Sequence, residues 1–468
     1  MTMSSSRLVA KNSVIQIIGK GISTALGIAV IALVTRALLP AGFGQYTKVI
    51  TFLSFFGIVA DLGLTLITAQ MISEKGADEE KIVSSILSFR IVSALLLFSL
   101  APVVGLFTPY SALVKWGIAI AAISFVFVSI TQTLVGIFQK HLVMHFPMIA
   151  ENAGRLALFG VTVYAFFSGK NLLWYLGAVV VGNVINFLFV WFFARRYVNI
   201  RLAWDRAVIA QMWKRSLPIA ISIIFNLVYL KADMLILSFV RPDVDVGLYG
   251  AAYRVIDILM MVPVMFMGLV LPIAASSWSS SDVTRVRRVV QKTFDAFMLY
   301  SIPILCGGLL VADKVMVLVA GNEFLNAGAP LRILLFAFFG ATLSTLFGHF
   351  IVALQRQRQV VWVYASDAFL AFSAYLALIP LFGISAAAWA TVGSEFYAAV
   401  ILGFVVVKTI KFRFDISGLW RIIAASIVMS LLVFVMLQAN MSVVWIIFIA
   451  SAVYVAALGI LKTHKIYL

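Results

Sequence analysis

The sequence predicts an all-α polytopic membrane protein with about 14 transmembrane helices. Apolar residues make up 63% of the 468 residues, charged residues only 11%, and the mean hydropathy is +1.10. A soluble domain carries roughly 25% charged residues and cannot bury this much apolar surface. The apolar runs are roughly 18–27 residues long, which suits helices that cross a hydrocarbon core. They lack the alternating pattern of an outer-membrane barrel, so the spans are helices.

The apolar runs follow one another with short connections. The predicted spans are 13–35, 46–69, 82–106, 112–136, 146–168, 172–194, 215–238, 246–275, 290–312, 330–354, 359–380, 384–408, 418–438 and 442–461. The first run continues to Thr35 without a small-residue cleavage pattern, so we expect a retained span, not a signal peptide. The longest connections, around 195–214 and 276–289, are too short to form a catalytic domain. We therefore expect a protein that is not an enzyme.

The net charge of +17 is distributed unevenly between the two sides of the membrane. With 14 spans, alternate loops lie on opposite sides, and both termini share one side. The loops of the opposite side carry only Arg36, Lys115, Lys170, Arg241 and Lys314, whereas the termini and their side carry most of the other cations. This asymmetry follows the positive-inside rule and predicts two cytoplasmic termini. We attribute the charge to topology and to anionic membrane lipids, and we expect no nucleic-acid partner.

A faint internal repeat predicts two related lobes. At an offset of 203 residues, Gly44 and Tyr46 recur as Gly247 and Tyr249; at an offset of 216, Glu151 recurs as Asp367. The predicted domains are an N-terminal lobe (1–200, spans 1–6), a C-terminal lobe (201–410, spans 7–12) and two appended spans (411–468). Lobes of six spans share one orientation and are related by an axis along the membrane normal. We expect them to enclose a central cavity.

Ionisable residues within the spans are the candidate functional residues, because each is costly in lipid unless it is paired or hydrated. The cations that we expect to bind substrate are Lys20, Arg90, Arg155, Lys231 and Arg254. The acids that are candidates for ion coupling are Asp61, Glu151, Asp233 and Asp257.

For four of these residues, the alternative to a functional role is an ion pair with a neighbour on the same helix. Glu151 and Arg155 are four residues apart, and Arg254 and Asp257 are three apart, so each pair can neutralise itself on one helix face. Asp233, two residues after Lys231, needs a partner on another helix or in a cavity.

For three further residues, the alternative to a functional role is a position at the membrane interface or at a helix end. Lys20 and Arg90 are near enough to the span ends for their long side chains to reach the headgroups. Asp61 lies near the cytoplasmic end of its span, where it is equally suited to cap a helix end.

The chain contains no signature of a resident cofactor. No nucleotide-binding loop, nucleophile elbow or metalloprotease helix occurs, so the chain is not its own ATPase. His141 and His145 are four residues apart, but no third ligand accompanies them, so we expect no metal site.

Two stretches resemble a known family. They are TRALLPAGFGQYTKVITFLSFFGIVADLGL (35–64) and LKADMLILSFVRPDVDVGLYGAAYRV (230–255), each with a loop glycine and tyrosine followed by a helix. The sequence resembles the polysaccharide-unit flippases of bacterial inner membranes, in the multidrug/oligosaccharidyl-lipid/polysaccharide (MOP) exporter superfamily. The similarity extends along the whole chain in length, span count and repeat.

The resemblance implies a V-shaped pair of six-helix lobes that works by alternating access. It implies transfer of an undecaprenyl-pyrophosphate-linked oligosaccharide, a unit of O-antigen or capsule, to the periplasmic leaflet for surface polysaccharide assembly. Cations that line the cavity are a feature of such flippases, which supports the five cations named above. A polysaccharide polymerase and a chain-length regulator are the protein partners that this function implies.

Four alternatives remain open. A multidrug or cation antiporter of the same superfamily would favour acids without opposing cations, and a lipid II flippase would be essential for growth. A polymerase or glycosyltransferase would need a larger extramembrane loop than this chain has. A scaffold without transport would not need charges at membrane depth.

Overall fold

The computed structural model describes the backbone of residues 3–461, and the side chains in that range except those of 3–18, 218–219 and 221–230. This part of the chain is helical without a β-strand, which confirms the predicted all-α class. In chain order its helices are α1 (Met3–Asp61), α2 (Leu64–Ile72), α3 (Glu79–Leu106), α4 (Ala112–Lys140), α5 (His145–Phe167), α6 (Leu172–Ala194), α7 (Arg206–Val240), α8 (Asp243–Ser279), α9 (Val283–Ala320), the 3-10 helix η1 (Asn322–Ala327), α10 (Gly328–Ala353), α11 (Gln357–Ile410), α12 (Leu419–Gln438) and α13 (Val443–Ile460).

Within the described residues, 10 helices are long and apolar enough to cross a membrane. Two of them, α1 with α2 and α11, correspond to two predicted spans each, because a backbone break divides them at Leu39 and at Gly383. Helices α5 and α7 lie where the spans 146–168 and 215–238 were predicted. The chain is therefore a multi-pass α-helical membrane protein.

The backbone breaks have local causes. Leu39 precedes Pro40, whose ring disfavours a helical conformation in the residue before it, and Leu39 has φ 57° and ψ 175°. Gly383 has φ 65° and ψ −140°, a region that essentially only glycine occupies. A third break, at Leu62 and Gly63, interrupts the predicted span 46–69, which is not one continuous helix.

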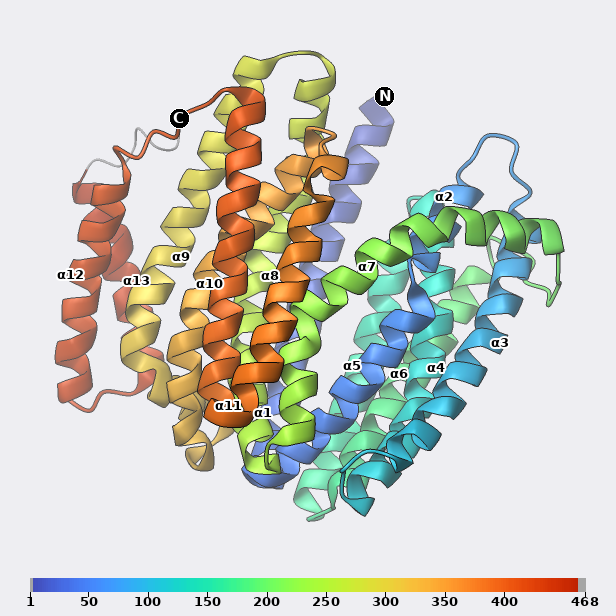
Figure 1. Ribbon diagram of the computed structural model, residues 1–468, viewed down its shortest axis with the longest axis horizontal. Helices are drawn as coiled ribbons and strands as arrows, with labels where there is room; N and C mark the ends of the chain where they lie inside the picture. Colours follow the sequence, from blue (N-terminus) through green and yellow to red (C-terminus); the bar gives the residue numbers. More distant parts are fainter. Residues whose placement is uncertain (1–2, 462–468) are drawn as a thin grey trace. The chain divides into compact units, whose positions relative to one another are not determined.

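The chain divides into two compact units. The first contains the residues up to Lys231 together with Pro242–Gly247, and the second contains Ala232–Arg241 together with the residues from Leu248 on. The predicted lobe boundary at residue 200 falls inside the first unit, and α12 and α13, predicted as an appendage, belong to the second. In the first unit α4 packs against α1, α3 and α6, and α5 packs against α1 and α6 (Figure 1).

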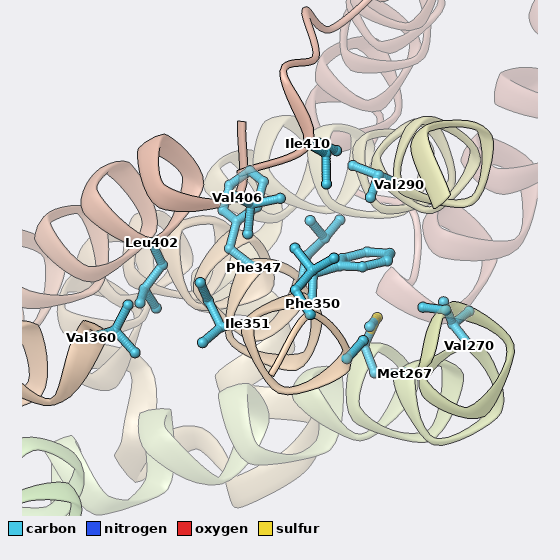
Figure 2. Packing of buried hydrophobic residues seen from close by; sticks show 14 of the residues in the cluster. Met267, Val270, Val290, Phe347, Phe350, Ile351, Val360, Leu402, Val406 and Ile410 are labelled. Carbon is cyan, nitrogen blue, oxygen red and sulfur yellow. The ribbon is translucent and has the colours of Figure 1, made fainter. Parts of the chain in front are cut away.

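The second unit is held by an apolar cluster that joins α8 to α11. Figure 2 shows Phe350 of α10 between Met267 of α8, Val290 of α9 and Val406 of α11, and all four are buried. Large apolar side chains also cover the outside, among them Phe369 at 70% exposure and Phe404 at 64%. Lipid tails are as apolar as these side chains, so close packing, not removal from water, must stabilise the cluster.

Two glycines of the repeat contact each other reciprocally inside the first unit. A Cβ on Gly44 would collide with the carbonyl oxygen of Asp243, and a Cβ on Gly247 would collide with the carbonyl oxygen of Pro40. Pro40 and Asp243 are themselves related by the offset of 203, so each repeat presents the same atoms to the other. Such exchange is the property of a two-fold contact, and it supports the internal repeat. The side chain of Asp243 joins this crossing through Lys48, at 2.6 Å from Nζ to Oδ1.

Four cations of the side predicted to hold both termini lie outside the described residues: the side chains of Arg7 and Lys11, and residues Lys462 and Lys465.

Replacing Gly247 with alanine should lower the thermal stability of the purified protein. The new methyl group would meet backbone atoms, which cannot move aside as a side chain can, and overpacking of this kind costs roughly 1–3 kcal/mol. The measurement is the melting temperature in detergent.

The matched control is Gly268→Ala on the same helix, where nothing lies within 4 Å of the added atom. It should be neutral or slightly stabilising, because alanine favours helix. Equal melting temperatures for the two variants would contradict the crossing.

Candidate functional site

The candidate site of the first unit lies between α1 and α5. Lys20 of α1 donates to Glu151 of α5 at 3.0 Å, and the hydroxyl of Ser23, one turn along, donates to the same carboxylate oxygen at 2.7 Å. Asn152 fixes the two helices further by donating to the carbonyl oxygen of Gly19 at 3.1 Å. The charged pair therefore lies on a polar seam that the packing of two helices creates.

The helical spacing allows an ion pair between Glu151 and Arg155, but the hydrogen-bond donors to Glu151 are on α1. Among the residues whose side chains are described, no carboxylate lies within ion-pair distance of the Arg155 guanidinium. Arg155 is half-buried one turn along α5, and a Cβ at Gly27 of α1 would lie 3.8 Å from its Nη1. The guanidinium therefore lies beside α1 at Gly27. The three ionisable groups Lys20, Glu151 and Arg155 together carry one net positive charge.

Arg90 is the most thoroughly enclosed cation of the described residues. Its side chain is 0% exposed and donates to Asp61 at 2.7 Å, to the carbonyl oxygen of Ala60 at 2.5 Å and to that of Ser129 at 3.1 Å. The idea that Arg90 reaches the headgroups is wrong, because these acceptors surround it inside the unit. Enclosed in this way, the Arg90 side chain has no exposed surface for a ligand to contact, and it fixes Asp61.

Asp61 has the capping role that was one of its two predicted roles. Its carboxylate accepts from the hydroxyl of Thr65 at 2.5 Å and from the amides of Gly63 and Thr65 at 3.3 and 3.4 Å. It therefore caps the first turn of α2 after the break, in addition to its ion pair with Arg90. The Asp-Leu-Gly sequence was the signal for this break, since glycine tolerates the φ of 83° at Gly63.

The first unit also contains a hollow of about 350 Å³ beside this break. Its walls come from α1, α3 and α4 and include Asp61, Ser129 and Gln132. Sequence reasoning missed it, because nothing in the spacing of these residues shows that three helices leave a space.

In the second unit, Arg254 and Asp257 form the predicted pair on α8. The nearest nitrogen and oxygen are 3.6 Å apart, and the side chains are 36% and 42% exposed. This pair is loose and accessible, so it remains available to another ion. Lys231, the last residue of the first unit before α7 enters the second, is half-buried.

Asp233 is buried and, as predicted, has a partner on another helix. The hydroxyl of Tyr249 on α8 donates to it at 2.7 Å, and Tyr249 is the tyrosine that repeats Tyr46. Two further buried acids lie on α11, where Asp367 accepts from Ser394 at 2.7 Å and Glu395 accepts from Ser344 at 2.8 Å. Buried carboxylates held by hydroxyls are chemically suited to take up a proton or a small cation.

The second unit also has a hollow of about 470 Å³ whose walls are almost wholly apolar. Helices α8, α9, α10, α12 and α13 form it, with Pro303, Gly307, Met429 and Ile446 among its lining residues. Gly307 and its neighbour Gly308 carry no side chains that would fill it.

Comparisons with known proteins agree on the family and on the fold. Residues 9–278 match the family model of the polysaccharide biosynthesis proteins. The chain is 23% identical over 389 residues to a Shigella flexneri protein named "Putative O-antigen transporter", with 79% of this chain and 90% of that protein covered.

Among solved structures, the lipid II flippase MurJ superposes with a TM-score of 0.77 at 14% identity, covering 96% of this chain and 99% of that one. A multidrug resistance transporter of the MATE family in the MOP superfamily superposes with a TM-score of 0.69 at 14% identity, covering 83% and 94%. At these identities the likeness shows the fold alone. The chain belongs to the polysaccharide biosynthesis protein family and has the fold of the MOP-superfamily transporters.

Proposed function

We propose that this chain is a flippase that moves undecaprenyl-pyrophosphate-linked oligosaccharide repeat units across the bacterial inner membrane by alternating access, for surface polysaccharide assembly. The observation that carries the proposal is the net positive group of Lys20, Glu151 and Arg155 within the spans of a polysaccharide biosynthesis protein. The expected activity is transport without chemical change of the substrate.

The group of Lys20, Glu151 and Arg155 lowers the main energetic cost of such transport. Moving a bare pyrophosphate into hydrocarbon would cost tens of kcal/mol. Fixed cations at membrane depth replace part of the lost hydration. Arg155 is the best candidate to contact the pyrophosphate, because no carboxylate lies within ion-pair distance of its guanidinium among the described side chains. Lys20 contributes through the pair with Glu151.

The other predicted cations have different proposed roles. Arg254 is a secondary candidate, since its pair with Asp257 is loose enough to exchange for a phosphate oxygen. Lys231 stays a candidate on its half-buried position. Arg90 supports the site indirectly by holding Asp61.

The apolar hollow of the second unit suits the lipid part of the substrate. An undecaprenyl chain is a hydrocarbon. The hollow has apolar walls, to which α12 and α13 contribute, so it can accept part of this chain without a desolvation cost. Headgroup and tail thus have separate candidate sites.

The membrane potential is a sufficient source of energy. Moving about two negative charges outward releases roughly 4–5 kcal/mol at 100 mV when the cytoplasm is negative. Ion coupling through Asp233 is a further proposal, supported by its burial beside Tyr249. Asp61 is a poorer coupling candidate, because Arg90 already balances its charge, and Glu151 is likewise paired with Lys20.

Two transporter alternatives fit less well. A drug or cation antiporter would need a net negative site, and the group at Arg155 is net positive. A lipid II flippase shares the fold, but the family and the Shigella flexneri relative favour surface polysaccharide. Loss of a lipid II flippase stops growth, whereas loss of a surface polysaccharide flippase does not, so the growth of a deletion strain separates the two.

We further propose that both termini are cytoplasmic and that a polysaccharide polymerase and a chain-length regulator work beside this chain. The proposal for the termini rests on the distribution of loop cations.

Replacing Arg155 with glutamine should reduce transport roughly 10- to 100-fold, which corresponds to the loss of a charged hydrogen bond. The measurement is transfer of radiolabelled lipid-linked oligosaccharide in vesicles, with and without an imposed potential. Arg155→Lys should retain part of the activity. The matched control is Arg201→Gln, an exposed loop arginine, which should leave transport unchanged. Wild-type transport by Arg155→Gln would rule out the anion site.

Lys20→Met should also reduce transport, because it leaves Glu151 to cancel the charge of Arg155. The double variant Lys20→Met with Glu151→Gln restores one net positive charge and should recover most of the loss. The same vesicle assay measures both. If the double variant is as impaired as the single one, the pair acts through helix packing and not through its charge.

Asp233→Asn should remove any dependence of transport on a proton or sodium gradient while transport driven by potential continues. Tyr249→Phe is the matched control, since it removes the hydrogen bond but keeps the carboxylate. Transport rates in vesicles with each gradient imposed separately measure the effect. Gradient dependence that survives in Asp233→Asn would exclude this acid as the coupling group.

A further inference from the structure

The hollow at the break in the second span has its own chemistry, distinct from that of the cationic group. It lies within the first unit and has a volume of about 350 Å³. A water molecule in the liquid takes up about 30 Å³, so the space is equivalent to on the order of ten waters. That volume accommodates one pyranose ring with some water around it. Its polar and aromatic lining residues are Ser54, Asp61, Phe98, Phe125, Ser129 and Gln132.

The charge of this hollow is balanced before any ligand enters. Among the described residues that line it, Asp61 is the one ionisable residue, and the Arg90 guanidinium lies 2.7 Å from its Oδ1. A second cation at Asp61 would be repelled by Arg90, which three further acceptors hold in place. An anion would meet the carboxylate. The electrostatics therefore favour a neutral ligand over an ion or a phosphate.

The lining offers hydrogen bonds that the protein itself does not use. Ser129 is 3% exposed, and its hydroxyl has no hydrogen-bond partner among the described residues. Burying a hydroxyl without a partner costs roughly 1–3 kcal/mol, so a small movement of the wall that opens this hydroxyl to a ligand or a water would be favourable. Gln132, one turn further along α4, is exposed and accepts only a 3.4 Å contact from Arg90.

Aromatic rings form the apolar part of the wall. The centroids of Phe98 and Phe125 are 5.7 Å apart, and a Cβ at Gly57 would lie 3.4 Å from the Phe125 ring. A pyranose has polar hydroxyls around its edge and apolar C–H groups on its faces. Amide, hydroxyl and carboxylate groups beside aromatic rings match both kinds of surface.

We propose that this hollow is a subsite for one neutral sugar residue of the repeat unit. The proposal rests on the proposed function, since it assigns one place to the sugar and another, at Arg155, to the pyrophosphate. The proposal also relates the break at Gly63 to the subsite. The cap at the start of α2 holds Asp61 at the wall of the hollow.

Saturation-transfer NMR of the purified protein tests the subsite directly. The probes are glucose, galactose, N-acetylglucosamine and, as an anionic comparison, glucuronic acid. The wild type should transfer saturation to at least one neutral sugar and more weakly to glucuronic acid. Ser129→Ala and Gln132→Leu should each weaken binding roughly tenfold, the equivalent of a hydrogen bond to a ligand.

The matched control is Ser124→Ala. Ser124 is on the same helix, is fully buried and also has an unpartnered hydroxyl, but it does not line the hollow. Ser129→Ala removes no hydrogen bond within the protein, so its melting temperature should match that of the control and of the wild type. Binding that is lost in Ser129→Ala and kept in Ser124→Ala supports the subsite.

Absence of transfer from all neutral sugars, or transfer that both lining variants leave unchanged, overturns the subsite. Failure of the proposed function is a separate result, because the wild type would then not move lipid-linked oligosaccharide in vesicles whether or not free sugars bind. If the wild type transports and the subsite is right, both lining variants should still bind undecaprenyl pyrophosphate that carries no sugar.

Discussion

The bilayer accepts no uncompensated charge, and this constraint explains most of the polar structure of the protein. Several charges within the helices are paired between two helices, such as Arg90 with Asp61 and Lys20 with Glu151. In these pairs, neutralising the charge and holding the helices together are one event. A charge without such a pair is costly in lipid. No carboxylate lies within ion-pair distance of Arg155 among the described side chains, so we centre the proposed function on that residue.

Packing in lipid also explains the close backbone contact inside the first unit. At the crossing of Gly44 and Gly247 the helices come close enough for carbonyl oxygens to replace side chains as neighbours. In lipid, helices associate through close packing and not through removal of apolar surface from water, so glycine at a crossing contributes more than a large apolar residue would. Asp243 lies at the crossing, yet its charge is balanced by Lys48.

The fold class followed from composition, because only membrane helices accommodate this much apolar sequence. The identity of the partners did not follow, since sequence spacing describes one helix at a time. Glu151 and Arg155 have good spacing for a pair, yet α1 brings Lys20 and Ser23 closer to the carboxylate. Arg254 and Asp257 do pair, because the spacing within α8 is what decides there. The hollow beside Asp61 depends on three helices and was invisible to any local pattern.

We propose that two kinds of polar site in the first unit hold different parts of a bulky amphiphile. A pyrophosphate needs unbalanced positive charge, whereas neutral sugars need hydrogen-bonding groups whose charges already cancel. In our proposal Arg155 provides the first, and the Asp61–Arg90 pair with Ser129 and Gln132 provides the second. If both requirements were met at one site, the cation that binds phosphate would be partly neutralised by the carboxylate that binds sugar. In the proposed arrangement the net positive group lies at α5 and the neutral pair lies at the break after α1, so the Asp61 carboxylate does not add to the acid that already accompanies Arg155.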